Sequence, residues 1–192
     1  MKKSFYAYLS RMRHIKRWGL MRNNMEENVA EHTFSVTLTA HALCIIRNTY
    51  FGGNVSEKDV LAAALYHEAG EVITGDLPTP IKYFDSDITQ SYKKIERHAE
   101  DTLVSMLPDE MQPQIAPYVR QEVTEDVRLI VKAADRLCAY IKCLEELRTG
   151  NREFEKACVR TKEAVEGMKL PEVEYFIEHF LPGYSLTLDE LN

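Results

Sequence analysis

The sequence predicts an all-α protein. Apolar residues recur three and four positions apart along most of the chain, as they do on the buried face of a helix. Capping residues precede several of these segments, and almost no segment shows the strict alternation of a half-buried strand. At 192 residues, we expect a single domain over residues 1–192 with seven or eight helices.

Local signals place these helices along the chain. Asn28 with Glu31, and Ser56 with Asp59, have the spacing of a capping box. Pro171 suits the first turn of the last helix, because a helix needs no backbone N–H there. The expected helices span residues 4–18, 28–48, 56–69, 87–106, 108–119, 124–148, 153–168 and 171–181.

Composition excludes several classes of protein. The chain is 45% hydrophobic and 28% charged, as is usual for a soluble domain, and no apolar run approaches the roughly 18 residues that span a membrane. The net charge of −6 argues against binding to nucleic-acid polymers. The cysteines form no C-x-x-C pair, so we interpret them as reduced core residues of a cytoplasmic protein: Cys44, Cys138, Cys143 and Cys158.

Charge is distributed unevenly along the chain. Residues 1–25 carry seven basic and no acidic residues, so all 30 acidic residues follow this segment. The segment has neither the apolar stretch nor the cleavage site of a secretory signal peptide. Two interpretations remain open: a solvated basic helix face, or a source of positive charge for an anionic ligand.

Residues 67–71 and the loop 75–80 form the most informative stretch. If residues 60–71 are helical, His67, Glu68 and Glu71 share one edge of the helix. One imidazole and two carboxylates would then meet at a helix end, beside a loop stiffened by prolines. Such an end suits a divalent metal and a substrate; the alternative is an exposed, polar helix terminus.

Two further polar residues fall on apolar helix faces. His32 lies in the first turn of the second helix, where a lone histidine is more often a core residue than a ligand. Asp135 lies in an apolar stripe, where a buried carboxylate needs a cation: Lys132, Arg136 or a metal. A donor set that suits Mn, Fe, Co or Zn with open positions would be His32, His67, Glu68 and Asp135.

These residues, in this order on an all-α chain, resemble the HD-domain metal-dependent phosphohydrolase superfamily. Within it, the sequence resembles the bacterial 5′-deoxynucleotidases over nearly its whole length. The motifs that carry the resemblance are Arg17-Trp18, residues 27–32 (ENVAEH), 67–71 (HEAGE), 75–80 (GDLPTP), 82–84 (KYF) and 134–140 (ADRLCAY). The resemblance implies an HD-type helical bundle.

The resemblance also implies an activity: metal-dependent hydrolysis of deoxyribonucleoside 5′-monophosphates to deoxynucleoside and phosphate, with discrimination against ribonucleotides, by a homodimer. It implies one divalent ion on His32, His67, Glu68 and Asp135, with Co²⁺ or Mn²⁺ favoured over Zn²⁺, Mg²⁺ or Fe²⁺. Catalytic roles fall to Glu71 as the acid–base group, Arg17 at the phosphate, and Asp76. The implied substrate-binding residues are Arg17, Trp18 at the sugar, His32, Asp76, Thr79, Pro80, Ile81, Lys82 and Asp135.

Glu68 departs from the superfamily, which has Asp at this position. Its carboxylate extends one methylene further, so the side chain must fold back or the metal must shift. Glu68 is then a tolerated variant, the mark of a weakened site, or a change that traps substrate. Two alternatives stay open: an HD hydrolase of deoxynucleoside triphosphates or signalling nucleotides, and a catalytically impaired nucleotide-binding module. A purely structural helical protein would leave Asp135 unexplained.

Overall fold

The computed structural model describes residues 3–82 and 84–191, without the side chain of Thr79. Within these residues the chain is helical, with no strand beyond an isolated antiparallel bridge between Lys16 and Asn28. The prediction of an all-α protein is confirmed. The α-helices are α1 (Phe5–Leu9), α2 (Val29–Tyr50), α3 (Glu57–Tyr66), α4 (Glu71–Thr74), α5 (Thr79–Lys82), α6 (Ser86–Ser105), α7 (Gln112–Val119), α8 (Glu125–Arg148), α9 (Glu155–Glu166) and α10 (Pro171–His179). The 3-10 helices are η1 (Ser10–His14), η2 (Arg152–Phe154), η3 (Leu181–Ser185) and η4 (Leu188–Glu190).

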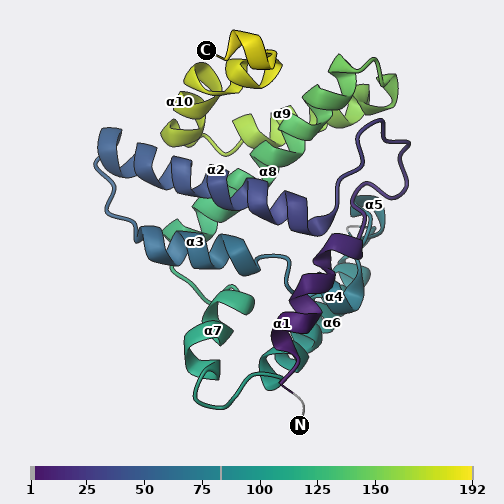
Figure 1. Ribbon diagram of the computed structural model, residues 1–192, viewed down its shortest axis with the longest axis vertical. Helices are drawn as coiled ribbons and strands as arrows, with labels where there is room; N and C mark the ends of the chain where they lie inside the picture. Colours follow the sequence, from purple (N-terminus) through teal and green to yellow (C-terminus); the bar gives the residue numbers. More distant parts are fainter. Residues whose placement is uncertain (1–2, 83, 192) are drawn as a thin grey trace.

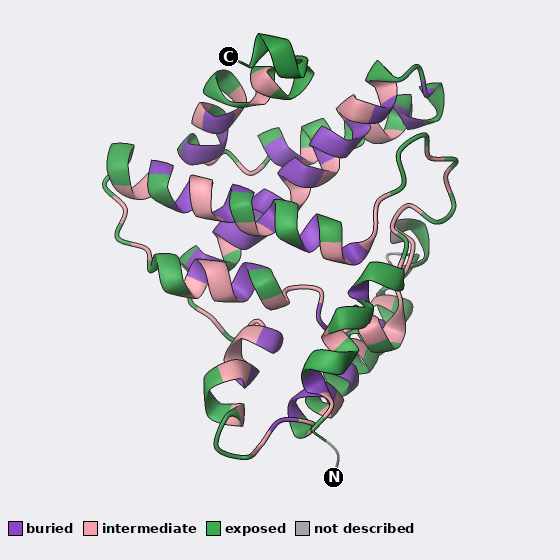
Figure 2. Ribbon diagram, in the orientation of Figure 1, coloured by how far each residue is buried: buried purple, intermediate pink, exposed green. Residues whose placement is uncertain are grey.

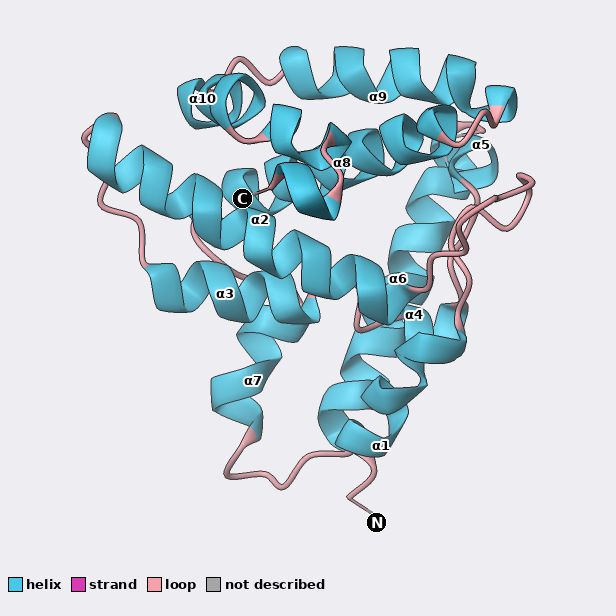
Figure 3. Ribbon diagram, turned by 45° about the horizontal axis from the view of Figure 1, so that its top comes forward, coloured by secondary structure: helices cyan, strands magenta, loops and turns pink. Residues whose placement is uncertain are grey.

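The helices enclose two clusters of buried apolar side chains. The larger cluster lies among α2, α3, α8 and α10, and Leu43, Ile130 and Leu137 are fully buried in it. The smaller cluster, around Phe5 and Leu103, joins α1, α6 and α7. Figure 1 shows α2 crossing in front of α8 with α3 below them, and Figure 3 shows α9 lying along α8. The turn after α3 therefore joins the two clusters.

Two of the expected helices end earlier than the sequence predicted. α1 ends at Leu9 and η1 continues only to His14, so the helix predicted over residues 4–18 is too long. Trp18 has φ +56°, a left-handed conformation that a helix interior excludes. Trp18 is therefore a loop residue and not the last residue of a helix.

The helix over residues 60–71 is also interrupted. α3 ends at Tyr66, residues 67–70 form a turn, and α4 begins at Glu71. The His67 ring nitrogen Nδ1 lies 2.7 Å from the carbonyl oxygen of Ala64 and competes with the helical backbone for this acceptor. The backbone hydrogen bonds tighten to i→i−3 through the turn. His67 and Glu68 thus project from a turn rather than from a helix edge.

The capping predictions differ in outcome. Asn28 and Glu31 form the complete capping box at the start of α2. The Ser56 hydroxyl accepts from the backbone of Asp59, but the Asp59 carboxylate accepts from the hydroxyl of Tyr118 instead of returning to Ser56. That second box is therefore only half formed. The four cysteines are free thiols, of which Cys158 is half-buried and the others buried.

α2 is more apolar than the sequence analysis allowed. Its length and composition would allow it to cross a membrane, and no other helix among the described residues meets both criteria. Half of its most apolar window, 50%, is buried inside the bundle, as in the core helix of a soluble protein. Its exposed side also carries large apolar residues, and Figure 2 shows exposed and buried residues alternating along it: Phe34, Leu38 and Ile45 are exposed.

Candidate active site

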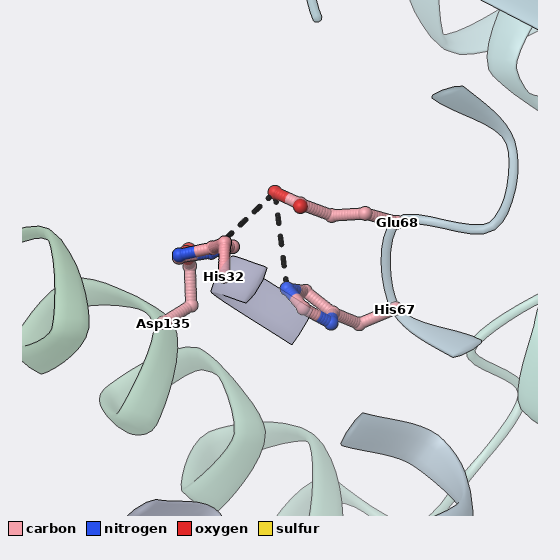
Figure 4. A group of neighbouring side chains, drawn as sticks. All are labelled: His32, His67, Glu68 and Asp135. Atoms are coloured by element: carbon pink, nitrogen blue, oxygen red, sulfur yellow. Dashed lines mark hydrogen bonds and ion pairs between the residues drawn. The ribbon is translucent and has the colours of Figure 1, made fainter. Parts of the chain in front are cut away.

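Four potential metal ligands from separate parts of the chain converge between α2, α3 and α8 (Figure 4). His32 comes from the first turn of α2, His67 and Glu68 from the turn after α3, and Asp135 from the middle of α8. One donor atom from each lies within 4.8 Å of the others. The structure brings the predicted set together, while ligation of a metal by this set stays a prediction.

Two of the donor atoms are buried without a hydrogen-bond partner and could each accept a cation. Because Nδ1 of His67 faces the Ala64 carbonyl, that nitrogen carries the hydrogen and Nε2 presents its lone pair to the cluster. Nε2 of His67 and Oε2 of Glu68 are buried and accept no hydrogen bond from a described residue. Buried polar atoms without a partner are rare in folded proteins. A divalent cation among these residues would satisfy both atoms.

His32 is fully buried between two carboxylates. Its Nε2 lies 3.0 Å from Oδ1 of Asp135, and its Nδ1 lies 3.7 Å from Oε1 of Glu27. Burial alone would lower the pKa of His32, but Asp135 and Glu27 outweigh it and raise the pKa to about 9. A metal on Nε2 would displace this proton, and the Glu27 carboxylate would remain the charge that faces Nδ1, at 3.7 Å.

Asp135 has neither of the basic partners that the sequence analysis considered. Its side chain is 38% exposed, toward a cavity, and it pairs with His32. Arg136 instead donates to the carbonyl of Ala164. Burial alone would raise the pKa of Asp135, but the hydrogen bond and charge of His32 hold it well below its usual range. Asp135 is thus an ionised cavity residue and not a fully buried carboxylate.

Arg17 connects the cluster to the N-terminal loop. Its Nη1 donates to Oε1 of Glu68 at 2.7 Å, and its Nε donates to Oε2 of Glu27 at 3.2 Å. Burial alone would lower the pKa of Arg17, yet the charges of Glu68, Asp135 and Glu27 raise it further above its usual value. The guanidinium is a permanent positive charge beside the four donors.

Glu27 is the site residue that the sequence analysis missed. Its Oε2 accepts from the indole Nε1 of Trp18 at 3.1 Å as well as from Arg17, and its Oε1 faces His32. The bridge between Lys16 and Asn28 returns the chain so that Glu27 lies opposite Arg17. Its only signal in the sequence is its place in the motif 27–32.

Glu71 and Asp76 lie close enough to Glu68 for their charges to interact with it. Oε2 of Glu71 is buried and has no hydrogen-bond partner among the described residues. Burial, together with the charges of Glu68 and Asp76, raises the pKa of Glu71 to about 9. Burial also raises the pKa of Asp76, and Arg17 opposes that shift. Two carboxyl groups with raised pKa values thus adjoin the predicted ligands.

A cavity of about 640 Å³ opens beside this cluster, within the size range of small-molecule sites. It is bounded by the loops 17–21 and 76–80 and by α8 and α9. The predicted substrate-binding residues that line it are Arg17, Trp18, Asp76, Pro80 and Asp135.

The remaining predicted substrate contacts lie away from the cavity wall or outside the described atoms. His32 is buried beside Asp135, and Ile81 is exposed. Nζ of Lys82 pairs with Glu96 at 2.7 Å. The Thr79 side chain is outside the described part of the structure. Substrate roles for these four residues stay predictions.

Comparison with known proteins identifies the family. The family described as 5′-deoxynucleotidase YfbR-like matches residues 4–184. The chain is 49% identical over 189 residues to 5′-deoxynucleotidase YfbR of Escherichia coli O1:K1, covering 98% of this chain and 95% of that protein. The chain belongs to the YfbR-like 5′-deoxynucleotidase family. Another relative of the same name, from Shigella boydii serotype 18, is 48% identical with the same coverage.

Solved structures share the fold of this YfbR-like chain. An HD-domain phosphohydrolase from Listeria innocua superposes with a TM-score of 0.81 at 22% identity, covering 94% of this chain and 88% of that one. The cyanophage S-2L HD phosphohydrolase DatZ, bound to dA and one catalytic Zn²⁺ ion, superposes with a TM-score of 0.62 at 20% identity, covering 92% and 96%. The predicted HD-type helical bundle is confirmed.

Proposed function

We propose that this protein is a metal-dependent 5′-deoxynucleotidase that hydrolyses deoxyribonucleoside 5′-monophosphates to deoxynucleoside and phosphate. One observation carries the proposal: the four donors lie within 4.8 Å of one another, beside Arg17, at a cavity large enough for a nucleotide. Membership of a family whose relatives are named 5′-deoxynucleotidases supports the reaction. A structural neighbour with bound dA supports the class of substrate.

We propose that His32, His67, Glu68 and Asp135 hold one divalent ion. Two nitrogens and two carboxylates suit Co²⁺ or Mn²⁺, with Zn²⁺, Mg²⁺ and Fe²⁺ as alternatives, and the neighbour DatZ holds Zn²⁺. When bound, such an ion supplies Lewis-acid activation of water and of a phosphoryl oxygen. The Glu27 carboxylate, 3.7 Å from Nδ1 of His32, favours the tautomer with hydrogen on Nδ1, which leaves Nε2 free for a metal.

Residues of the chain bind the phosphate and move the proton. Arg17 points its guanidinium at the cluster and neutralises charge that develops on the phosphoryl oxygens. Glu71, whose Oε2 is buried and unpaired among the described atoms, exchanges a proton with the attacking water or the leaving 5′-oxygen. Asp76 reaches the same cavity from the loop after α4 and contacts the nucleotide.

We propose that Trp18 excludes the ribose 2′-hydroxyl. Its indole is held by Glu27 at Nε1 and rests against the ring of Phe154, with 5.3 Å between the ring centroids. An aromatic side chain fixed at both its polar edge and its face leaves little room for an added hydroxyl. Rejection by packing of this kind is worth on the order of 10- to 200-fold.

The deciding experiment is phosphate release from dAMP and from AMP by the metal-stripped protein with Co²⁺, Mn²⁺, Mg²⁺ or Zn²⁺ added back. A Glu68→Asp variant is assayed alongside. We expect metal-dependent turnover of dAMP and little turnover of AMP. If only Glu68→Asp is active, this chain is the impaired nucleotide-binding module. If both are silent with dAMP but convert dATP to deoxyadenosine and tripolyphosphate, this chain is a triphosphate hydrolase.

We also propose a cytoplasmic homodimer that binds neither a membrane nor a nucleic-acid polymer. The exposed apolar residues Phe34, Leu38 and Ile45 follow one side of α2 and offer a surface for a second copy. Light scattering of the purified protein should give twice the monomer mass. Leu38→Glu should then give the monomer mass, and a monomer in both proteins would contradict the dimer.

A further inference from the structure

A buried ionic cluster lies outside the active site, at the end of α8. We call Lys142, Glu146 and Asn151 the Glu146 cluster; their exposed fractions are 4%, 0% and 6%. Nζ of Lys142 lies 2.5 Å from Oε1 of Glu146. None of the three residues lines the cavity. Burying an ion pair costs several kcal/mol unless additional hydrogen bonds offset the loss of water, so this cluster needs an explanation.

The additional hydrogen bonds come from the backbone of the N-terminal loop. Oε2 of Glu146 accepts from the amide of Asn24 at 2.9 Å, and Oε1 accepts from the amide of Met25 at 3.0 Å. Lys142 donates to the carbonyl of Met25. Asn151 donates to the carbonyl of Arg22 at 2.7 Å. Figure 1 shows this loop, in dark purple, reaching the end of α8.

The same loop carries Trp18, and a second contact links the indole to the cluster. The Trp18 ring rests on Phe154, which is fully buried, and Nζ of Lys142 lies 5.8 Å from the centroid of the same Phe154 ring. The carbonyl of Trp18 accepts from the amide of Met21 at 2.8 Å, directly before the segment 22–25 that the cluster holds. The left-handed backbone of Trp18 is unfavourable by itself, so its surroundings must hold it.

We propose that Lys142, Glu146 and Asn151 are positioning residues that hold Trp18 at the cavity and thereby set the discrimination between deoxyribonucleotides and ribonucleotides. This inference rests on the proposed role of Trp18. The cluster residues are neither predicted ligands nor residues of the cavity wall, and they act through the loop and through Phe154.

Glu146→Gln tests the cluster at its centre. Each carboxylate oxygen accepts two donors: Oε1 from Lys142 and Met25, and Oε2 from Asn24 and Asn151. An amide replaces one oxygen with an NH₂ group, which then faces two N–H donors. The loop must move away from α8, although the side chain keeps its shape.

The chain offers a matched control in Glu172. This glutamate is 1% exposed and pairs with Arg47 at 3.4 Å, and it belongs to α10 rather than to the loop contacts. Glu172→Gln therefore perturbs a buried glutamate that has a cationic partner but lies outside the Glu146 cluster. A milder second variant, Asn151→Ala, removes the hydrogen bonds to the carbonyl of Arg22 and to Glu146 and keeps the pair of Lys142 with Glu146.

Trp18 provides its own reporter, because it is the only tryptophan of the chain. We would measure its emission maximum and acrylamide quenching, and the ratio of kcat/KM for dAMP to that for AMP, in folded variants. In Glu146→Gln we expect emission at longer wavelength, stronger quenching, and a deoxy/ribo ratio lowered about tenfold or more. Asn151→Ala should change both in the same direction, and Glu172→Gln should change neither.

The outcomes separate this inference from the proposed function. If Trp18→Ala changes the deoxy/ribo ratio while folded Glu146→Gln and Asn151→Ala leave emission and ratio unchanged, the inference is overturned and the role of Trp18 stands. Equal changes of emission and ratio in Glu172→Gln also overturn the inference, because the effect would then be a general loosening of the fold. An unchanged ratio in Trp18→Ala overturns the role of Trp18 and, with it, the claim about selectivity. If Glu146→Gln does not fold, Asn151→Ala decides.

Discussion

Glu68 reaches the ligand cluster despite its longer side chain. Its Oε1 lies 3.7 Å from Nε2 of His32 and 3.8 Å from Nε2 of His67. Arg17 holds the same oxygen from the opposite side, at 2.7 Å. Because residues 67–70 form a turn, the backbone places the carboxylate without the spacing of a regular helix. The extra methylene is therefore accommodated, and the chain keeps four donors together.

Removal of Glu68 should weaken metal binding. A metal that binds only the folded state stabilises it by about 2.7 kcal/mol at a concentration of 100 Kd. We expect Co²⁺ or Mn²⁺ to raise the Tm of the wild-type protein, and Glu68→Ala to lose most of that rise. Glu57→Ala, which changes an exposed residue at the start of α3, is the control. An equal rise in wild type and Glu68→Ala would remove Glu68 from the ligand set.

Glu71 provides the test of proton transfer. Glu71→Gln keeps the volume of the side chain but cannot exchange a proton, so kcat for dAMP should fall about 100-fold or more. The rise in Tm with metal should persist, since Glu71 is outside the predicted ligand set. An unchanged kcat would show that another group moves the proton.

At the scale of elements, the short helix α4 and its ending place two site residues. α4 begins with Glu71 and ends at Thr74, and the next residue, Gly75, has φ +73° and ψ 167°. That conformation is almost restricted to glycine. Asp76 follows directly and enters the cavity wall. The direction of the loop therefore depends on a backbone conformation that other residues avoid.

Gly75→Ala should cost about 1–3 kcal/mol of stability and lower activity. An added Cβ at Gly75 meets no atom within 4 Å, so the cost is backbone strain and not a steric clash. Gly183→Ala is the control, because Gly183 is equally uncrowded and its φ is not left-handed. Urea unfolding of both variants measures the difference. Equal stabilities would contradict the strain argument.

At the scale of the whole molecule, Glu146 fastens the N-terminal loop to α8, and its pKa is lowered in the folded protein. Burial alone would raise the pKa of Glu146, but the donors on Lys142 and Asn151 and the amides of Asn24 and Met25 lower it to about 2. Because the folded-state pKa lies below the ordinary value of 4.5, the stabilisation is complete above 4.5. It is lost as the pH falls through the folded-state pKa.

Wild-type protein and Glu146→Gln should therefore converge in stability at low pH. We expect a constant difference in the free energy of unfolding above about pH 5 and a shrinking difference as the pH falls below 4.5 toward 2. Urea unfolding at a series of pH values measures both proteins. A difference that stays the same down to about pH 3 would show that the charge of Glu146 does not stabilise the fold.

The sequence by itself determined the helical class and the extents of helices such as α2 and α8, because helical periodicity and capping are local properties. It also determined the identities of the four converging donors. Only the tertiary structure decided the turn at residues 67–70, the left-handed Trp18, the role of Glu27 and the Glu146 cluster. These features depend on contacts between distant residues: Arg17 meets Glu68 across 51 positions, and Met25 meets Glu146 across 121. Local patterns carry no information about such pairs, so their geometry follows only from the packing of the helices.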